Sequence, residues 1–177
     1  MKKIVKILLI IFVPIFLAVG GIALFMNAVK NPLPPGTVAD KVLIEKKDRR
    51  LTLLSNGKTL KAYRVALGRN PEGKKLQDGD KRTPEGAYRI DWRKERSRYR
   101  RALHISYPND NDIVQAKARG VSPGGDIMIH GLPNGIGFIG KIHVKRDWTL
   151  GCVAVTNPEI EEIWRVVPDG TVVEIVP

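Results

Sequence analysis

An uncharged segment near the N-terminus restricts the fold of this chain more than any other feature does. Ile7–Met26 carries no charged side chain, three lysines precede it, and Lys30 is the only positive charge just beyond it. A helix of that length spans about 30 Å, which is the thickness of the hydrocarbon core of a bilayer. The asymmetry of the lysines places the N-terminus in the cytoplasm and the rest of the chain outside. The sequence therefore predicts a membrane anchor over residues 1–30, with a cleaved signal peptide as the alternative.

A short proline-rich segment follows the anchor and leads into one domain. Residues 31–37 hold three prolines, which favour an extended, stiff linker, and residues 38–177 suit a single domain. The chain carries a formal net charge of +12. Such a charge favours anionic neighbours, and the export signal makes nucleic acid an unexpected partner. The basic run Arg93–Arg101 is interpreted either as a solvated face or as a landing surface for wall polymer, stem carboxylates or lipid headgroups.

Short apolar or alternating segments between turn residues predict a mainly β domain with two helices. Asn56-Gly57 is typical of a hairpin turn, and Pro158 is expected at the first position of the second helix, with Asn157 as its N-cap. The strands are predicted at 42–45, 50–54, 60–66, 83–92, 102–107, 126–131, 152–155 and 171–176, and the helices at 109–120 and 156–170.

Cys152 is the only cysteine, so it cannot form a disulfide within the chain. A lone thiol in an exported protein is a candidate reactive group. A cysteine nucleophile needs a base and donors for the oxyanion. His130 ends one predicted strand before Gly131, and Cys152 begins another after Gly151, whose N–H could join that of Cys152 as an oxyanion donor. These residues alone leave open the alternatives of an inert buried thiol and a structural histidine.

The segments "IMIHG" and "IGKIHVKRDWTLGCVAVTN" resemble the active-site block of the YkuD-type L,D-transpeptidase catalytic domain family. They resemble the branch whose cysteine block reads Asp-Trp-Thr-x-Gly-Cys. His130-Gly131, Thr149, Gly151-Cys152 and Asn157 match the pattern, and "GRNPEGKKLQDGDKRTPEGAYRIDW" and "VSPGGDIMIHGLPNG" extend the similarity to roughly residues 41–176. The resemblance implies twisted β-sandwich or barrel-like sheets with about two helices.

The resemblance also implies a cell-envelope enzyme that acts on peptidoglycan stem peptides and needs neither a metal nor a cofactor. Cys152 is expected to attack the carbonyl before the terminal D-alanine of a tetrapeptide. His130 is expected to take and return the proton, and the Gly131 carbonyl to orient the imidazole. D-Alanine leaves, and the acyl group passes to an amine, which gives a crosslink or an attached wall protein. Wall biogenesis and cell shape are the expected processes.

Two positions depart from the pattern of the family. Leu150 stands where many members have a histidine, and Ala154 stands where many have an arginine that can meet a substrate carboxylate. Two alternatives therefore stay open. One is a hydrolase of the same fold that cleaves peptidoglycan peptides or wall-protein links. The other is a catalytically inactive, basic wall-binding module.

Five further residues are expected to support the site or to contact substrate. Thr149 is expected to order the turn before the cysteine. His143 could approach the thiol or pair with Asp147, since an oriented histidine usually needs a partner. Trp148 could belong to the core or line the pocket, and His104 could be a structural hydrogen-bonding residue or a substrate contact.

Overall fold

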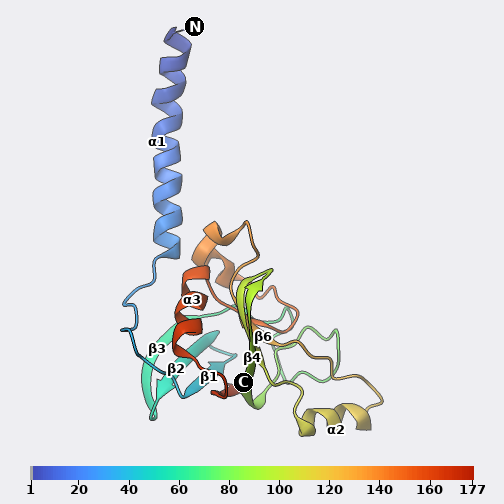
Figure 1. The fold of residues 1–177 in the computed structure, drawn as a ribbon. Helices are drawn as coiled ribbons and strands as arrows, with labels where there is room; N and C mark the ends of the chain where they lie inside the picture. Colours follow the sequence, from blue (N-terminus) through green and yellow to red (C-terminus); the bar gives the residue numbers. More distant parts are fainter. Residues whose placement is uncertain (1) are drawn as a thin grey trace.

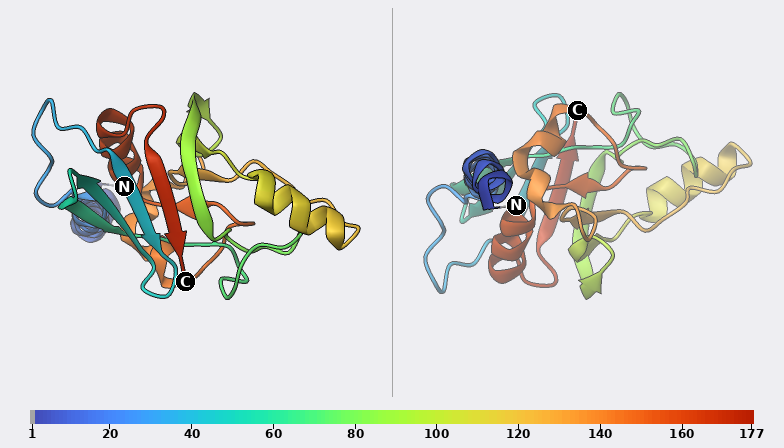
Figure 2. Two further views of the ribbon diagram at one scale, coloured as in Figure 1. Left: turned by 90° about the horizontal axis from the view of Figure 1, so that it is seen from below. Right: turned by 90° about the horizontal axis from the view of Figure 1, so that it is seen from above.

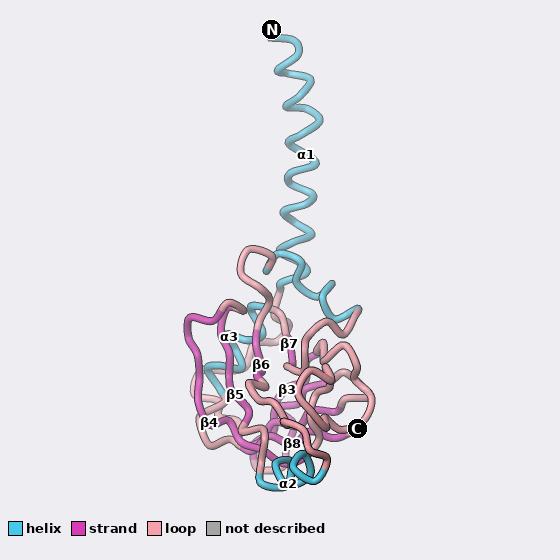
Figure 3. Tube along the Cα trace, turned by 90° about the vertical axis from the view of Figure 1, so that its right-hand side faces the viewer, coloured by secondary structure: helices cyan, strands magenta, loops and turns pink. Residues whose placement is uncertain are grey.

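Helix α1, Lys2–Asn27, projects from a β-rich domain in the computed structural model, which describes the backbone of residues 2–177 and the side chains of residues 12–177 (Figure 1). Only the C-terminal end of α1 meets the domain, at the 3₁₀ helix η1, Gly137–Lys145 (Figure 3). Asn27 Nδ2 donates to the carbonyl of Phe138 at 3.2 Å, and Lys141 Nζ donates to that of Ala28 at 3.1 Å. The first helix therefore ends on the segment that follows His130.

The membrane-crossing helix predicted for residues 1–30 is not confirmed. Within the part of the chain that the structure describes, no helix is both long enough and apolar enough to cross a bilayer. A helix does form in this region, but its described side chains cover only 12–27, a length of about 24 Å. The three lysines that precede the uncharged segment lie outside the described side chains, whereas Lys30 lies within them.

Eight strands form one mixed sheet in the order β3-β2-β1-β8-β4-β5-β6-β7. The strands are twisted relative to one another (Figure 2). Strands β1 and β8 pair in parallel, as do β6 and β7, and the other neighbours are antiparallel. The strands are β1 Lys41–Glu45, β2 Arg50–Ser55, β3 Lys58–Arg64, β4 Gly86–Ser97, β5 Arg100–Ile105, β6 Met128–His130, β7 Val153–Ala154 and β8 Val172–Val176.

Of the two predicted arrangements, a sandwich and barrel-like sheets, the single mixed sheet agrees with the barrel-like one, because the long strand β4 joins its two halves. The first part of β4, 86–89, pairs with β8, whereas 90–97 pairs with β5. The twelve-residue strand therefore joins two groups of strands that would otherwise form separate sheets. The mainly β class and the two α-helices of the domain agree with the prediction, whereas η1 was not predicted.

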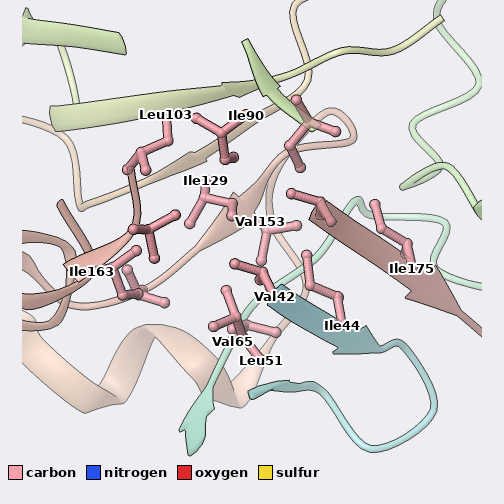
Figure 4. Packing of buried hydrophobic residues seen from close by; sticks show 14 of the residues in the cluster. Val42, Ile44, Leu51, Val65, Ile90, Leu103, Ile129, Val153, Ile163 and Ile175 are labelled. Carbon is pink, nitrogen blue, oxygen red and sulfur yellow. The ribbon is translucent and has the colours of Figure 1, made fainter. Parts of the chain in front are cut away.

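Buried and more exposed side chains alternate along the strands, and the buried ones form one core on one side of the sheet. In β1, Val42 and Ile44 are fully buried between more exposed neighbours, which is the pattern of a strand with one covered face. Figure 4 shows these side chains in one buried cluster with Val153 from β7 and Ile163 from the C-terminal helix. Burying an aliphatic side chain of this kind contributes about 1.5–3 kcal/mol. The core therefore fixes the position of the strands that carry the cysteine and the histidine.

The two helices of the domain begin with capping boxes. Helix α2, Asp110–Ala118, has Asn109 as its N-cap. Helix α3, Asn157–Val166, has Thr156 as its N-cap, because the Thr156 hydroxyl accepts from the Glu159 N–H and the Glu159 carboxylate accepts from the Thr156 N–H. The prediction of Asn157 as N-cap is therefore wrong by one residue, and its side chain is available for another contact.

Glu162 on α3 joins the proline-rich segment, the sheet and the helix. This buried carboxylate accepts from Lys61 Nζ at 2.5 Å, from the Tyr63 hydroxyl at 2.8 Å and from the Leu33 N–H at 2.6 Å. Burial by itself raises the pKa of Glu162. The three hydrogen bonds outweigh burial, so the pKa lies below its ordinary value.

We expect Glu162→Ala to lower the free energy of unfolding by about 3 kcal/mol, because the change leaves the partly buried Lys61 without its counter-charge. Tyr63→Phe, the matched control, removes one donor and should cost about 1 kcal/mol. Urea denaturation at pH 7 measures both values. Since the pKa of Glu162 is depressed, its contribution is present above pH 4.5 and is lost as the pH falls through the folded-state pKa. Equal losses in the two variants would contradict this role.

Candidate active site

One face of strands β5, β6 and β7 carries the candidate nucleophile and base. The parallel register pairs Ile129 with Val153, and both side chains belong to the core. Because side chains alternate between the faces of a strand, the flanking His130 and Cys152 lie on the opposite face. The antiparallel register of β5 places His104 on that face as well. Residues far apart in the chain are thus brought onto one surface by short strand pairings.

Thr149 locks the turn that leads into Cys152. Its hydroxyl donates to the Cys152 carbonyl at 2.7 Å and accepts from the Gly151 N–H at 3.1 Å. Its main chain pairs with a neighbouring segment, since Thr149 N donates to the Leu67 carbonyl at 3.1 Å and Arg69 N donates to the Thr149 carbonyl at 3.0 Å. The Gly151 N–H therefore already donates to Thr149. Of the two predicted oxyanion donors, only the Cys152 N–H stays available for a substrate.

Position 151 requires a glycine, both because of its backbone conformation and because neighbouring atoms leave no room for a Cβ. Its φ of +137° lies in a region that favours glycine, and a Cβ would stand 2.8 Å from the Arg82 carbonyl oxygen and 3.0 Å from Cδ1 of Ile127. Gly68 approaches from the other side, where a Cβ would lie 3.2 Å from the Gly151 Cα. The glycine-rich loop 68–82 therefore packs directly on the turn that carries the cysteine.

The Cys152 thiol is partly exposed and holds its proton. Its Sγ donates to the Asp126 carbonyl at 3.5 Å. Burial raises the pKa of the thiol, the charge of Asp126 adds to this effect, and the Met128 N–H and the charge of Lys75 oppose it. With the pKa above its ordinary value, the group is a neutral thiol at pH 7. A base must therefore remove the proton before the sulfur can act as a nucleophile.

His130 is oriented as a proton acceptor. Its Nδ1 lies 2.6 Å from the Gly131 carbonyl oxygen, which can only accept, so Nδ1 carries the proton and Nε2 has a free lone pair. Burial lowers the pKa of His130 to about 4, so the ring is neutral at pH 7. Among the described residues, no hydrogen bond joins His130 to Cys152 in this unliganded arrangement.

Asn157 fixes the main chain that orients His130. Its Oδ1 accepts from the Leu132 N–H at 2.8 Å, and a Cβ on Gly131 would stand 2.7 Å from the same oxygen. The backbone at Gly131 is therefore held close to the start of α3. Asn157 acts on the imidazole through the Gly131 carbonyl, which makes it a positioning residue.

Aromatic rings enclose His130 on two sides. The Tyr99 ring centroid lies 4.5 Å from that of His130, and Trp148 meets His130 edge-on at 5.8 Å. The Trp148 Nε1–H donates to His143 Nδ1 at 3.4 Å. These contacts give Trp148 a place in the wall of the site, beside the candidate base.

His143 is buried behind Trp148, and its Nε2 has no hydrogen-bond partner among the described residues. Burial lowers the pKa of His143 to about 4, and the charge of His130 acts in the same direction. Pairing with Asp147, one of the two alternatives for His143, is not found. Asp147 instead accepts from Arg49 Nη2 at 2.9 Å and from the Leu67 N–H at 2.9 Å, because the turn directs its carboxylate toward the segment beside Thr149.

His104 lies on the face of the site but has its own partners. Its Nδ1 is 2.6 Å from Asp91 Oδ1, and its ring stacks on Trp92 with centroids 4.5 Å apart. These contacts agree with the structural interpretation of His104. Within the described residues, no group of three or more His, Cys, Asp or Glu side chains is placed to hold a metal ion.

Two residues of the site, Tyr99 and Asp126, were not predicted from the sequence. Tyr99 lies within the basic run 93–101, and its only sequence signal is a single aromatic residue among six basic ones. Asp126 contacts the thiol through its main-chain carbonyl and has a positive φ of 54°. A backbone contact of this kind leaves no residue-type signal, so the sequence could not reveal it.

Comparison with known proteins points to one family. The YkuD family model, described as the L,D-transpeptidase catalytic domain, matches residues 39–175. The putative L,D-transpeptidase YafK of Escherichia coli K12 is 28% identical over 182 residues, which cover 97% of this chain and 66% of YafK. The chain thus spans a little under two thirds of the length of that relative.

Solved structures give the same result for the fold. The helical cell shape determining protein Pgp2 from Campylobacter jejuni superposes with a TM-score of 0.61 at 25% identity, covering 89% of this chain and 54% of Pgp2. Bd1075 from Bdellovibrio bacteriovorus superposes with a TM-score of 0.54 at 22% identity, covering 82% of this chain and 52% of Bd1075. The likeness to Bd1075 shows the fold alone.

The two buried histidines should make the domain less stable in mild acid. Both pKa values fall from 6.5 to about 4, so between these values the unfolded chain binds more protons than the folded domain. The free energy of unfolding therefore decreases as the pH falls through this window. We expect His143→Gln to reduce that slope by about 1 kcal/mol per pH unit, since one titrating group is removed.

Urea denaturation at a series of pH values between 6.5 and 4.5 measures the slope. Cys152→Ala is the matched control, because a thiol with a raised pKa does not titrate in this range. A His143→Gln variant with the same slope as the unmodified protein would show that His143 is not a buried neutral group.

Proposed function

This chain belongs to the L,D-transpeptidase catalytic domain family, and we propose that it is a peptidoglycan L,D-transpeptidase whose nucleophile is Cys152. The observation that carries the proposal is the shared sheet face of Cys152 and His130, with the base oriented by Gly131 and the nucleophile turn locked by Thr149. The donor substrate is a stem tetrapeptide, and the attacked carbonyl precedes its terminal D-alanine.

Attack begins with transfer of the thiol proton. Rotation about the Cα–Cβ bond of Cys152 takes Sγ away from the Asp126 carbonyl and toward Nε2 of His130. His130 accepts the proton as the C–S bond forms, and the Gly131 carbonyl stabilises the imidazolium through Nδ1–H. The Cys152 N–H donates to the developing oxyanion. The low pKa of His130 favours return of the proton in the next step.

Collapse of the tetrahedral intermediate breaks the C–N bond. His130 Nε2–H protonates the leaving amine of D-alanine, and a thioester on Cys152 remains. An amine acceptor then attacks the thioester carbonyl, gives its proton to His130 and releases the Cys152 thiol. If water attacks in place of the amine, the product is a shortened peptide, and the protein is then a hydrolase.

The place of action follows from the substrate. Peptidoglycan lies in the cell envelope, so residues 38–177 are proposed to act there as the catalytic domain, with 31–37 as a linker. Pgp2 is described as determining helical cell shape, and we extend a role in wall architecture to this chain on the strength of that similarity. Attachment to the membrane is not included, because the described residues do not support it.

Incubation of the full chain with disaccharide tetrapeptide, with and without an acceptor amine, tests the proposal by mass spectrometry of the products. A crosslinked product and free D-alanine are expected. Cys152→Ala should abolish turnover, and His130→Gln should lower kcat by about 10²–10⁴-fold because the base is lost. Both variants should unfold cooperatively at temperatures close to that of the unmodified protein.

The other outcomes separate the alternatives. Tripeptide and D-alanine without a crosslink identify a hydrolase. Retained wall binding without any turnover identifies a binding module and contradicts the proposal. A carbapenem adduct mapped to Cys152 would be independent support, because the lactam carbonyl offers the thiol the same kind of electrophile.

A further inference from the structure

Strand β4 contains one extra residue where it passes His104. The register of β4 on β5 shifts between Ile90 and Arg93, so Asp91 and Trp92 together oppose the single residue His104. A bulge of this kind turns a side chain toward a different face of the strand. In a regular strand, Trp92 would share the buried face of Ile90. It instead stacks on His104, on the face that carries the candidate nucleophile and base.

The Trp92 ring is a flat platform with one face covered and the other open. Its centroid lies 4.5 Å from that of His104, and the two ring planes are inclined by only 15°. His104 is buried and its Nδ1 lies 2.6 Å from Asp91 Oδ1, so the ring beneath Trp92 is fixed in place. Trp92 nevertheless keeps 40% of its surface exposed. Because stacking covers one face, the opposite face and the ring edge are available to a ligand.

A free carboxylate oxygen accompanies the platform. Asp91 uses Oδ1 for His104, and among the described residues its Oδ2 has no hydrogen-bond partner, although the side chain is 41% exposed. A carboxylate accepts strong hydrogen bonds from hydroxyl groups. The electron-rich face of an indole attracts polarised C–H groups. A sugar ring offers both kinds of group, since its C–H face is bordered by hydroxyls.

The strand registers place this platform in the same row as the nucleophile. His104 pairs with Met128, and the pairing of β6 with β7 puts Met128 beside Cys152. Neighbouring strands lie about 4.8 Å apart, so β4 stands about 14 Å from β7 across the sheet. The platform and the thiol are therefore separated by the width of three strand spacings on one face.

This separation fits the proposed substrate. Three residues of the stem lie between the attacked carbonyl and the sugar, and an extended chain of three residues spans about 10 Å. The group that links the peptide to the sugar adds further length. A stem that runs across the sheet from Cys152 therefore brings its sugar to β4.

Two other exposed or partly exposed rings of the domain are already occupied. The ring of Trp164 has the guanidinium groups of Arg93 and Arg101 at 5.0 and 4.9 Å from its centroid. Tyr99 packs on His130 and so belongs to the wall of the reaction site. Trp92 differs from both because its only aromatic neighbour among the described residues is the supporting imidazole of His104.

We propose that Trp92 and Asp91 form a saccharide site, in which the sugar that carries the stem peptide stacks on the indole and donates a hydroxyl to the carboxylate. The inference rests on the proposed function, which it deepens by naming the part of the substrate that is read far from the bond that breaks. A donor with its glycan attached gains this contact, whereas a free tetrapeptide does not.

The test compares kcat/KM of the full chain for disaccharide tetrapeptide with that for the free tetrapeptide. The unmodified protein should prefer the glycan-bearing donor by about tenfold, the range expected for one aromatic stacking contact. Trp92→Ala should reduce this preference to about twofold or less, and Trp92→Tyr, which keeps a ring, should retain most of it. Ile113→Ala, which shortens an exposed apolar side chain on α2, is the matched control and should keep the full preference.

A second measurement does not depend on turnover. In a Cys152→Ala background, calorimetry with disaccharide tetrapeptide should show binding weakened about tenfold by Trp92→Ala. Asp91→Asn, which can still accept from His104 but lacks the free charged oxygen, should weaken binding by about threefold or more. Equal loss of affinity for the free tetrapeptide in Trp92→Ala would indicate a structural role through His104 and would overturn the inference.

The remaining outcomes are equally decisive. If the unmodified protein shows no preference for the glycan-bearing donor, or if Trp92→Ala keeps that preference, the saccharide site is wrong while the proposed reaction stands. If neither donor is turned over, the proposed function itself fails. Binding of the disaccharide tetrapeptide that still depends on Trp92 would then show that the saccharide site exists without the reaction.

Discussion

The parallel pairing of β6 with β7 is the constraint on which the rest of the site depends. It joins segments 128–130 and 153–154, and it places the imidazole and the thiol on one face of the sheet. A pairing this short has few hydrogen bonds of its own. The core side chains Ile129 and Val153 hold it from below, and the bonds of Thr149 and Asn157 hold the flanking loops. The chemistry of the surface is thus positioned by packing on the opposite side of the sheet.

Burial and hydrogen bonding then set the resting protonation states. Burial raises the pKa of the thiol and lowers that of His130, so the unliganded site holds a neutral pair and not a thiolate–imidazolium pair. Each neutral group has a main-chain carbonyl as its acceptor, Asp126 for Cys152 and Gly131 for His130. In the proposed reaction, proton transfer between the two groups therefore waits until a substrate carbonyl makes it favourable.

Residue patterns predicted the strands and the segments that carry the site. Alternation of apolar and polar residues indicates which side chains are buried, and turn residues indicate the local backbone geometry. They did not predict how strands far apart in the chain join, or that β4 would connect two groups of strands in one sheet. The likeness to a known family brought His130 and Cys152 together. The pairing of Asp147 with Arg49 was not predicted, because Arg49 lies 98 residues away and spacing reports only local neighbours. Contacts made by backbone atoms, such as that of Asp126, carry no residue-type signal.

The bond from the thiol to the Asp126 carbonyl also bears on how the proposed nucleophile would survive in an oxidising cell envelope. Peroxides and disulfides react with thiolates, and a sulfur that keeps its proton reacts slowly with both. The chain has no second cysteine to rescue a sulfenic acid as a disulfide. Because the resting site withholds the reactive form, chemical damage to Cys152 is limited to the interval in which the base has taken its proton. The same contact that keeps the thiol protonated in the free protein therefore protects the proposed nucleophile from oxidation.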